Sequence, residues 1–140
     1  MVGIETKFKK VHESGKRKSA VARAIMESGN GKVTFNGRDI SSLDMFNRLS
    51  LEEPLRIAES VLGKIEFNCK LLAKGGGEKG QIDASRLALA KAILAFNNSE
   101  ELRNALTLYD RSLLVADVRR KETRKPGDSK ARAKRQTSFR

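Results

Sequence analysis

The segment IEFNCKLLAKGGGEKGQIDASRLALAKAILAF, residues 65–96, contains a strand pattern, a glycine-rich stretch and a helix pattern in succession. Ile65, Phe67, Cys69 and Leu71 alternate with polar residues, which predicts a strand with one buried face. Residues 83–97 are rich in Ala and Leu and predict a helix, with Asp83 as its N-cap. Residues 75–80 between these elements predict a flexible loop. The segment therefore predicts a helix packed against a sheet.

Further strands are expected on the N-terminal side of this segment. Residues 4–11 alternate in part and predict an edge strand. Residues 19–26 and 32–35 also have strand patterns, and the Gly/Asn-rich loop 28–31 between them predicts that they pair as a β-hairpin. Asn36-Gly37 marks another turn.

The helices and the last strand complete the expected order. Residues 42–62 predict two helical pieces, the second with Pro54 in its first turn. Ser99 is expected to cap a short helix, and residues 113–118 to form a last strand. The resulting order β-β-α-β-α-β predicts an α+β fold, an α/β sandwich in which one mixed sheet carries its helices on one face.

Charge is distributed unevenly along the 140 residues. The formal net charge is +12, yet residues 27–110 hold 11 basic and 12 acidic side chains. Residues 1–26 hold seven basic and two acidic side chains, and residues 111–140 hold 11 and three. A cationic excess of this size calls for a polyanionic partner, and phosphates are the commonest. We therefore expect a globular domain over 1–118 and an extended, basic RNA-binding tail over 119–140, which is too polar to fold alone.

Several other classes of protein are disfavoured. One cysteine, Cys69, and one histidine, His12, cannot make an internal disulfide or a Cys/His zinc cluster, and no metal or other cofactor is expected. No signal peptide or apolar run long enough to cross a membrane is visible, so a cytoplasmic protein without a membrane partner is expected. A solvated tail, a nuclear-localisation segment and a DNA-binding protein remain alternatives to RNA binding, although no helix-turn-helix is visible.

The glycine stretch offers an alternative from another class, a small phosphate-binding enzyme. Gly75 and Gly80 have the spacing that begins a P-loop, but Gln81 and Ile82 stand where its Lys and Ser or Thr would follow. The cation for the phosphates and the hydroxyl for magnesium are therefore missing. The simpler interpretation is that the glycines let the backbone come close to the sheet or to an RNA phosphate, and no catalytic residue is assigned.

The stretch Gly75-Gly-Gly-Glu-Lys-Gly-Gln-Ile-Asp-Ala84, continuing through 88–93, resembles the signature of the small-subunit ribosomal protein nine family. Residues 15–23, 29–38 and 125–140 are similar to the N-terminal strand, the hairpin and the C-terminal extension of that family. The ending Ser-Phe-Arg resembles archaeal members. The resemblance implies a fold shared with the second domain of ribosomal protein five, including a left-handed βαβ crossover.

The resemblance also implies a structural role in translation. The protein would bind ribosomal RNA in the head of the small ribosomal subunit, beside other head proteins. Charge and resemblance together predict the following RNA-binding residues: Lys16, Arg17, Lys18, Arg23, Gly75, Gly76, Gly77, Lys79, Arg119, Arg120, Lys121, Arg124, Lys125, Lys130 and Arg132.

The tail would extend to the peptidyl site and contact the anticodon stem-loop of transfer RNA. In the family the final arginine makes this contact, which falls on Arg140, with Lys134 and Arg135 nearby. Phe139 stands where bacterial relatives often have a Lys, and it could stack on the RNA or serve as a spacer.

Overall fold

The computed structural model describes residues 9–127 and 130–133. Its elements, in chain order, are β1 (Lys10–Arg17), β2 (Ala20–Ser28), β3 (Val33–Phe35), β4 (Arg38–Asp39), the 3₁₀ helix η1 (Ile40–Ser42), α1 (Met45–Leu62), β5 (Phe67–Lys74), α2 (Glu78–Asn97), α3 (Glu100–Tyr109) and the 3₁₀ helix η2 (Arg111–Leu113).

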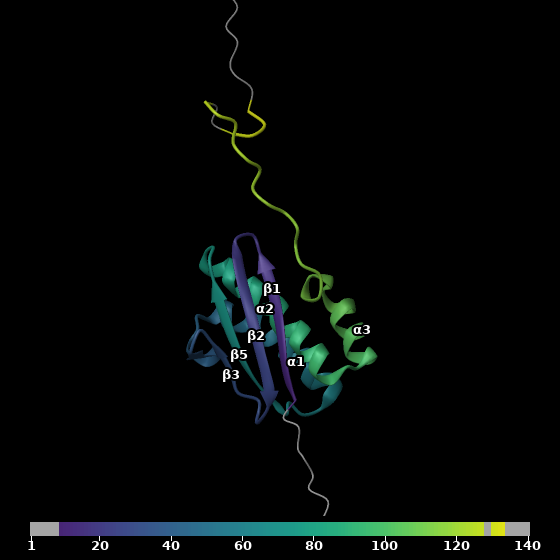
Figure 1. The fold of residues 1–140 in the computed structure, drawn as a ribbon. Coiled ribbons are helices and arrows are strands. Elements are labelled where there is room, and N and C mark those ends of the chain that lie inside the picture. The colour runs from purple at the N-terminus through teal and green to yellow at the C-terminus, as the bar shows by residue number, and fades with distance from the viewer. Residues whose placement is uncertain (1–8, 128–129, 134–140) are drawn as a thin grey trace, which may run out of the picture.

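The five strands form one mixed sheet in the order β1-β2-β5-β3-β4. Neighbouring strands are antiparallel except β3 and β5, which are parallel and are connected through α1. Helix α2 covers β1, β2 and β5, α1 packs on α2, and α3 packs on α1 (Figure 1). The predicted α+β class, with a mixed sheet and its helices on one face, is confirmed.

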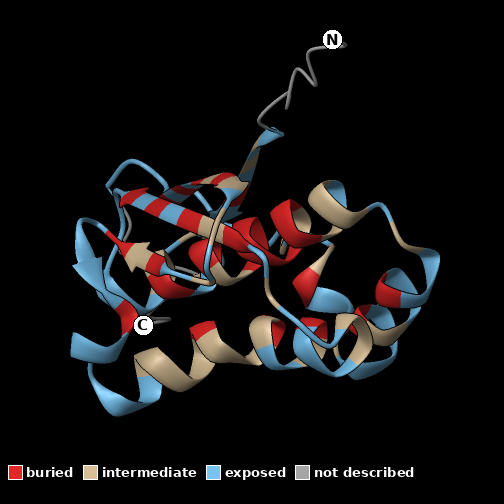
Figure 2. Ribbon diagram, turned by 90° about the horizontal axis from the view of Figure 1, so that it is seen from below, coloured by how far each residue is buried: buried red, intermediate tan, exposed pale blue. Residues whose placement is uncertain are grey.

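Alternation of apolar and polar residues determines which face of each strand meets the helices. In β2 the buried positions are Ala20, Ala22, Ala24 and Met26, and in β5 they are Phe67, Cys69, Leu71 and Ala73. Figure 2 shows the resulting bands of buried and exposed residues along the strands. The intervening residues form the opposite face of the sheet, which none of the helices in the described part of the chain covers.

Small residues let α2 come unusually close to the sheet. A Cβ atom built on Gly15 of β1 would lie 2.1 Å from the Ala84 carbonyl oxygen and 2.8 Å from the Ala88 amide nitrogen of α2. Ala84 and Ala88 are fully buried, and so are Ala22 and Ala24 on the facing strand β2. The helix backbone therefore packs almost directly on the strand backbone at Gly15.

The predicted hairpin between residues 19–26 and 32–35 is wrong. β2 pairs with β1 and β5, so β5 lies between β2 and β3. The loop that follows β2 crosses the start of β5 instead of reversing, and the Asn68 side chain accepts hydrogen bonds from the backbone N–H groups of Asn30 and Lys32 at 3.0 and 2.9 Å. Residues 28–31 do form a loop, as predicted. The strand that lies between β2 and β3 is β5, which comes from a distant part of the chain.

Two further predictions at the ends of elements are wrong. α2 begins at Glu78, with Gly77 in the N-cap position, so Asp83 lies inside the helix. The helix begins earlier than predicted, since the backbone N–H of Gln81 already donates a helical hydrogen bond to the Gly77 carbonyl. Residues 113–118 form no strand: η2 ends at Leu113, and an irregular chain follows.

The remaining boundaries agree in part with expectation. Ser99 caps α3, since its Oγ accepts a hydrogen bond from the Leu102 amide, as predicted. α1 is one continuous helix that contains Pro54, where two pieces were expected. The edge strand expected at 4–11 lies largely outside the described residues, and β1 begins at Lys10.

We predict that Gly15→Ala destabilises the fold by ~1–3 kcal/mol, because the added methyl group would overlap backbone atoms of α2 that cannot rotate away. Urea or thermal unfolding monitored by circular dichroism measures this effect. Gly80→Ala is the matched control: its Cβ would meet only ordinary contacts at 3.5 Å or more, and it lies in a helix, where Ala is favoured over Gly. Equal stability of the two variants would contradict the close approach at Gly15.

Cys69 is buried, and burial raises the pKa of its thiol to about 12. We predict that iodoacetamide at pH 8 leaves Cys69 unmodified in the folded protein and alkylates it in urea, as mass spectrometry would detect. Because the unfolded thiol ionises near its ordinary pKa of ~8.5, the free energy of unfolding should also fall as pH rises from about 9 toward 12. Rapid alkylation of the folded protein would contradict this assignment.

Candidate nucleic-acid interface

The turn between β1 and β2 presents a cluster of cations at one end of the sheet. Lys16 and Arg17 end β1, and Lys18 and Ser19 form the turn, with Lys18 in the left-handed region at φ 52°. Lys16 and Lys18 are exposed, whereas Arg17 is partly buried. We call residues 16–19 the hairpin tip.

The glycine turn at residues 75–77 lies directly against the hairpin tip. A Cβ on Gly75 would lie 2.7 Å from the Ser19 carbonyl oxygen, and one on Gly76 would lie 3.0 Å from the Ala20 amide nitrogen. Both glycines have positive φ, at 77° and 64°. The glycines therefore allow two backbone segments to touch, which is the simpler of the two interpretations that the sequence left open.

The side chains near the glycine turn are engaged within the protein. The side-chain amide of Gln81 donates through Nε2 to the Gly75 carbonyl at 3.1 Å. The Glu78 carboxylate accepts a hydrogen bond from the Asn47 side-chain amide at 2.7 Å. Ile82 is buried in the core. The position where a P-loop carries its phosphate-binding Lys is thus occupied by a neutral side chain that closes the turn itself.

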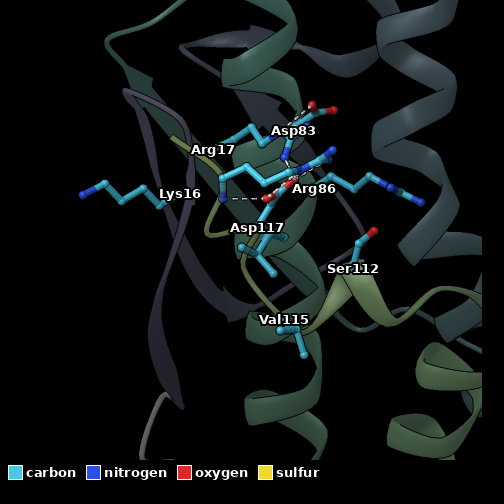
Figure 3. Close-up of a pocket in the computed structure, with 9 residues that line it drawn as sticks. Lys16, Arg17, Asp83, Arg86, Ser112, Val115 and Asp117 are labelled. Carbon is cyan, nitrogen blue, oxygen red and sulfur yellow. Dashed lines mark hydrogen bonds and ion pairs between the residues drawn. The ribbon is translucent and has the colours of Figure 1, made fainter. Parts of the chain in front are cut away.

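Asp117 attaches the first residues of the tail to the hairpin tip. Its carboxylate pairs with Arg17 of β1 and with Arg119, whose Nη2 lies 2.6 Å from Asp117 Oδ2. Arg17 Nε also lies 3.5 Å from the Asp83 carboxylate of α2 (Figure 3). Arg120 donates to the backbone carbonyl of Lys18. The tail therefore leaves the globular part of the protein beside the hairpin tip.

A second ion-pair group joins the helices. Arg86 Nη2 of α2 lies 2.5 Å from Glu53 Oε2 of α1 and 3.2 Å from Asp110 Oδ2 at the end of α3. Hydrogen bonds from Ser112 lower the pKa of the Asp110 carboxyl, and Arg86 lowers it further. These contacts fix η2, and with it the start of the chain leading to Asp117.

The two ion-pair groups line a cavity of about 260 Å³. Lys16 is at its rim and points away from it, as Figure 3 shows. The cavity is bounded by Lys16, Arg17, Asp83, Arg86, Leu87, Ser112, Val115, Asp117 and Arg119. Its carboxylates are paired with arginines, and no group of three or more His, Cys, Asp or Glu side chains in the described part of the chain could hold a metal ion. The cavity is a junction that positions the tail.

A groove of about 720 Å³ runs between the hairpin tip and the first tail residues. We call it the basic groove, and it is lined by Arg17, Lys18, Ser19, Arg119, Arg120 and Lys121. Five of these six residues are cationic and none is acidic. A second groove, of about 550 Å³, adjoins it between the hairpin tip and the glycine turn and includes Lys79. Glu78 and Asp83 also line this second groove, so the cationic surface is concentrated in the basic groove.

Beyond Lys121, the described part of the tail, 122–127 and 130–133, extends away from the sheet and helices (Figure 1). Arg124, Lys125 and Lys130 are exposed. Arg132 forms a bidentate pair with Glu122, with Nη2 2.5 Å from Oε1 and Nε 2.9 Å from Oε2. This pair lowers the pKa of the Glu122 carboxyl and raises the pKa of Arg132.

Most of the predicted RNA-binding residues that the structure describes therefore gather around the hairpin tip or follow one another along the tail. Arg23 is the exception, because it lies in the middle of β2 on the face that no helix covers. Lys134, Arg135, Phe139 and Arg140, predicted to contact transfer RNA, lie outside the described residues.

Two structural features were not predicted from the sequence, one beside the basic groove and one on the sheet. Asp117 was assigned to a strand, and its ion pair with Arg17 was not predicted because the two residues are far apart in the sequence. The exposed Lys70 and Lys74 were also overlooked, although they alternate with the buried residues of β5 and so had to point away from the helices.

Comparison with known proteins gives a consistent result. The family model described as ribosomal protein S9/S16 matches residues 15–140. The small ribosomal subunit protein uS9 of Methanococcus vannielii is 42% identical over 136 residues, covering 95% of this chain and 100% of that protein. The uS9 proteins of Thermoplasma volcanium and Thermoplasma acidophilum are 44% and 45% identical, covering 91% of this chain and 96% and 98% of theirs.

The glycine turn, the helix that follows it and the basic tail, which carried the resemblance, all lie within the matched region. The chain therefore belongs to the ribosomal protein S9/S16 family.

Proposed function

We propose that this protein is a structural constituent of the small ribosomal subunit that binds ribosomal RNA in the head of the subunit. The basic groove is the observation that carries the proposal. Residues about 100 positions apart in the sequence, Lys18 and Lys121, line it together. Phosphate oxygens are the ligands that such clustered guanidinium and ammonium groups favour.

The ion pairs of the groove support this role. Arg17 and Arg119 share Asp117, so part of their charge is neutralised and their side chains are held in place. Lys18 and Lys121 are exposed at the margin and have no acidic partner among the described residues. The groove thus combines fixed arginines with lysines that remain available for phosphate, as expected where backbone contacts fix the orientation of a protein on RNA.

The tail extends the proposed interface. Its composition offers almost no apolar surface to bury, and beyond Lys121 its described part lies away from the globular part of the protein. We propose that it becomes ordered along RNA and that its last residues, with Arg140 and Phe139, contact transfer RNA at the peptidyl site. Neighbouring head proteins complete the set of partners.

The alternative of a phosphate-handling enzyme gains no support from the site. The glycine turn packs on the hairpin tip, and the carboxylates nearest to it are paired with cations or amides. No helix among the described residues has the length and apolar character that crossing a membrane requires. Membership of the ribosomal protein S9/S16 family supports a structural role on cytoplasmic ribosomes without catalytic activity, which is the role that we propose.

We predict that binding to a small-subunit ribosomal RNA transcript weakens steeply as salt rises, because each bound phosphate releases counterions. Lys121→Gln/Arg124→Gln should lower the slope of log affinity against log salt by about 1 for each phosphate that the variant no longer neutralises. Filter binding at several salt concentrations measures this slope. Lys64→Gln/Arg103→Gln, which removes two exposed cations that neither line the groove nor belong to the tail, is the charge-matched control. A flat salt response of the unmodified protein would refute the electrostatic mechanism.

We predict that deleting Ser138–Arg140 weakens transfer RNA binding at the peptidyl site of reconstituted small subunits by about tenfold or more, the effect expected when a charge-assisted hydrogen bond of ~1.5–3 kcal/mol is removed. Thermal unfolding of the isolated protein should be unchanged. Arg140→Lys separates the need for a planar guanidinium from the need for a charge. Equal transfer RNA affinity of truncated and intact subunits would exclude this contact.

A further inference from the structure

We infer that the face of the sheet opposite the helices is a second RNA-binding surface, made of residues that belong neither to the lining of the basic groove nor to the tail. We call it the open face, and it consists of the outward-pointing side chains of β1, β2 and β5. These are Lys10, His12, Ser14, Lys16, Val21, Arg23, Ile25, Glu27, Asn68, Lys70, Leu72 and Lys74. The inference rests on the proposed function and adds a surface to it.

The register of the strands defines how these side chains lie beside one another. Lys16 is opposite Val21, which is opposite Lys74 on the other side. One row further, Arg23 lies between Ser14 and Leu72. Strands are spaced about 4.8 Å apart, so Lys16 and Lys74 stand about 10 Å apart at the two sides of β2. Cations therefore surround a small apolar centre.

The charge of the open face is almost entirely of one sign. It carries five cations, from Lys10, Lys16, Arg23, Lys70 and Lys74, and one carboxylate, from Glu27. Glu27 is already neutralised, because Lys10 Nζ lies 2.8 Å from its Oε1. The other four cations form no ion pair with any residue that the structure describes.

The titration of Glu27 reflects the same surroundings. Its hydrogen bond and attraction to Lys10 lower the pKa of the Glu27 carboxyl, and the charges of Lys70 and His12 lower it further. Side chains from all three strands thus act on one point of the open face. A field of this sign attracts a polyanion and repels a basic protein surface.

Its apolar centre is exposed but small. Val21 is 38% and Leu72 is 47% exposed, and Ile25 beside them is partly buried. A protein partner would be expected to meet a broader apolar core with charges confined to the rim. Here a cation, Arg23, lies within the centre itself, next to Leu72. Scattered cations around a few aliphatic side chains suit the phosphates and sugars of a shallow RNA groove.

The open face is also continuous with the basic groove. Lys16 belongs to the hairpin tip, and Lys74 immediately precedes the glycine turn. Figure 1 shows that the hairpin tip and the tail lie at the same end of the sheet. An RNA segment bound in the groove therefore has a cationic surface to follow along the strands, and Arg23, isolated from the other predicted residues, becomes part of an extended interface.

The test uses the full chain and a small-subunit ribosomal RNA transcript as the probe. Lys70→Gln/Lys74→Gln removes two cations of the open face without touching the groove or the tail. We expect the slope of log affinity against log salt to fall by about 1 to 2, whereas the control Lys64→Gln/Arg103→Gln keeps the slope of the unmodified protein. Lys70→Arg/Lys74→Arg should also keep it, because the charge is retained. Circular dichroism verifies that all three variants are folded.

A second measurement needs no substitution. Acetylation of surface amines, followed by mass spectrometry, reports the accessibility of each lysine in the unmodified protein. The RNA transcript should protect Lys70 and Lys74 and leave Lys64 reactive.

The outcomes separate this inference from the proposed function. A glutamine variant with the slope of the unmodified protein, or Lys70 and Lys74 that stay reactive on RNA, would overturn the open-face inference while leaving the groove and tail untouched. Protection that requires other ribosomal proteins would assign the face to a protein partner and also overturn it. A flat salt response of the unmodified protein would instead refute the proposed function itself.

Discussion

The contact between α2 and the first two strands is the constraint on which the rest of the molecule depends. At Gly15 the strand backbone has no side chain, and the facing helix offers only Ala84 and Ala88. The helix therefore lies nearer to the sheet than larger residues would permit, and its first turn comes level with the hairpin tip. Because of this close packing, the glycine turn that precedes α2 meets the hairpin tip. A larger residue at position 15 would displace one end of the proposed interface relative to the other.

Sequence patterns predicted the helices and strands of the fold better than they predicted which strands pair with one another. Alternation in β5 and composition in α2 identified both elements, because side-chain periodicity is a local property. The pairing of β2 with β5 is different, since it depends on a strand about 40 residues away that Asn68 helps to hold against the loop after β2. The prediction for residues 113–118 failed differently. Their apolar residues suggested a strand, but the segment does not pair with the free edge of β1; Asp117 contacts β1 through the Arg17 side chain, and Leu113 is buried in the core at the end of η2.

The sequence predicted which basic residues belong to the candidate site but not how those residues are arranged in space. Runs of Lys and Arg at 16–18 and 119–121 indicated the chemistry, yet nothing local shows that the two runs adjoin. Their proximity is produced by Asp117 and by the Arg120 contact with Lys18, both of which join distant parts of the chain. Lys70 and Lys74 could have been recognised from strand alternation alone, whereas their nearness to Arg23 required the strand register.

Attachment of the tail at Asp117 affects how often the far end of the tail occupies a binding site for which its own affinity is weak. With the globular part of the protein held on RNA as proposed, the 22 residues of 119–140 start from a fixed origin and span about 70 Å when fully extended. Binding by the tip then becomes an intramolecular event, governed by an effective local concentration instead of the cellular one. Because the tail is fixed at its origin, the effective concentration of its tip is high at an RNA site within reach of the tail. The effective concentration is zero at a site that the tail cannot reach. Tail length and anchor position would thus act together as a ruler.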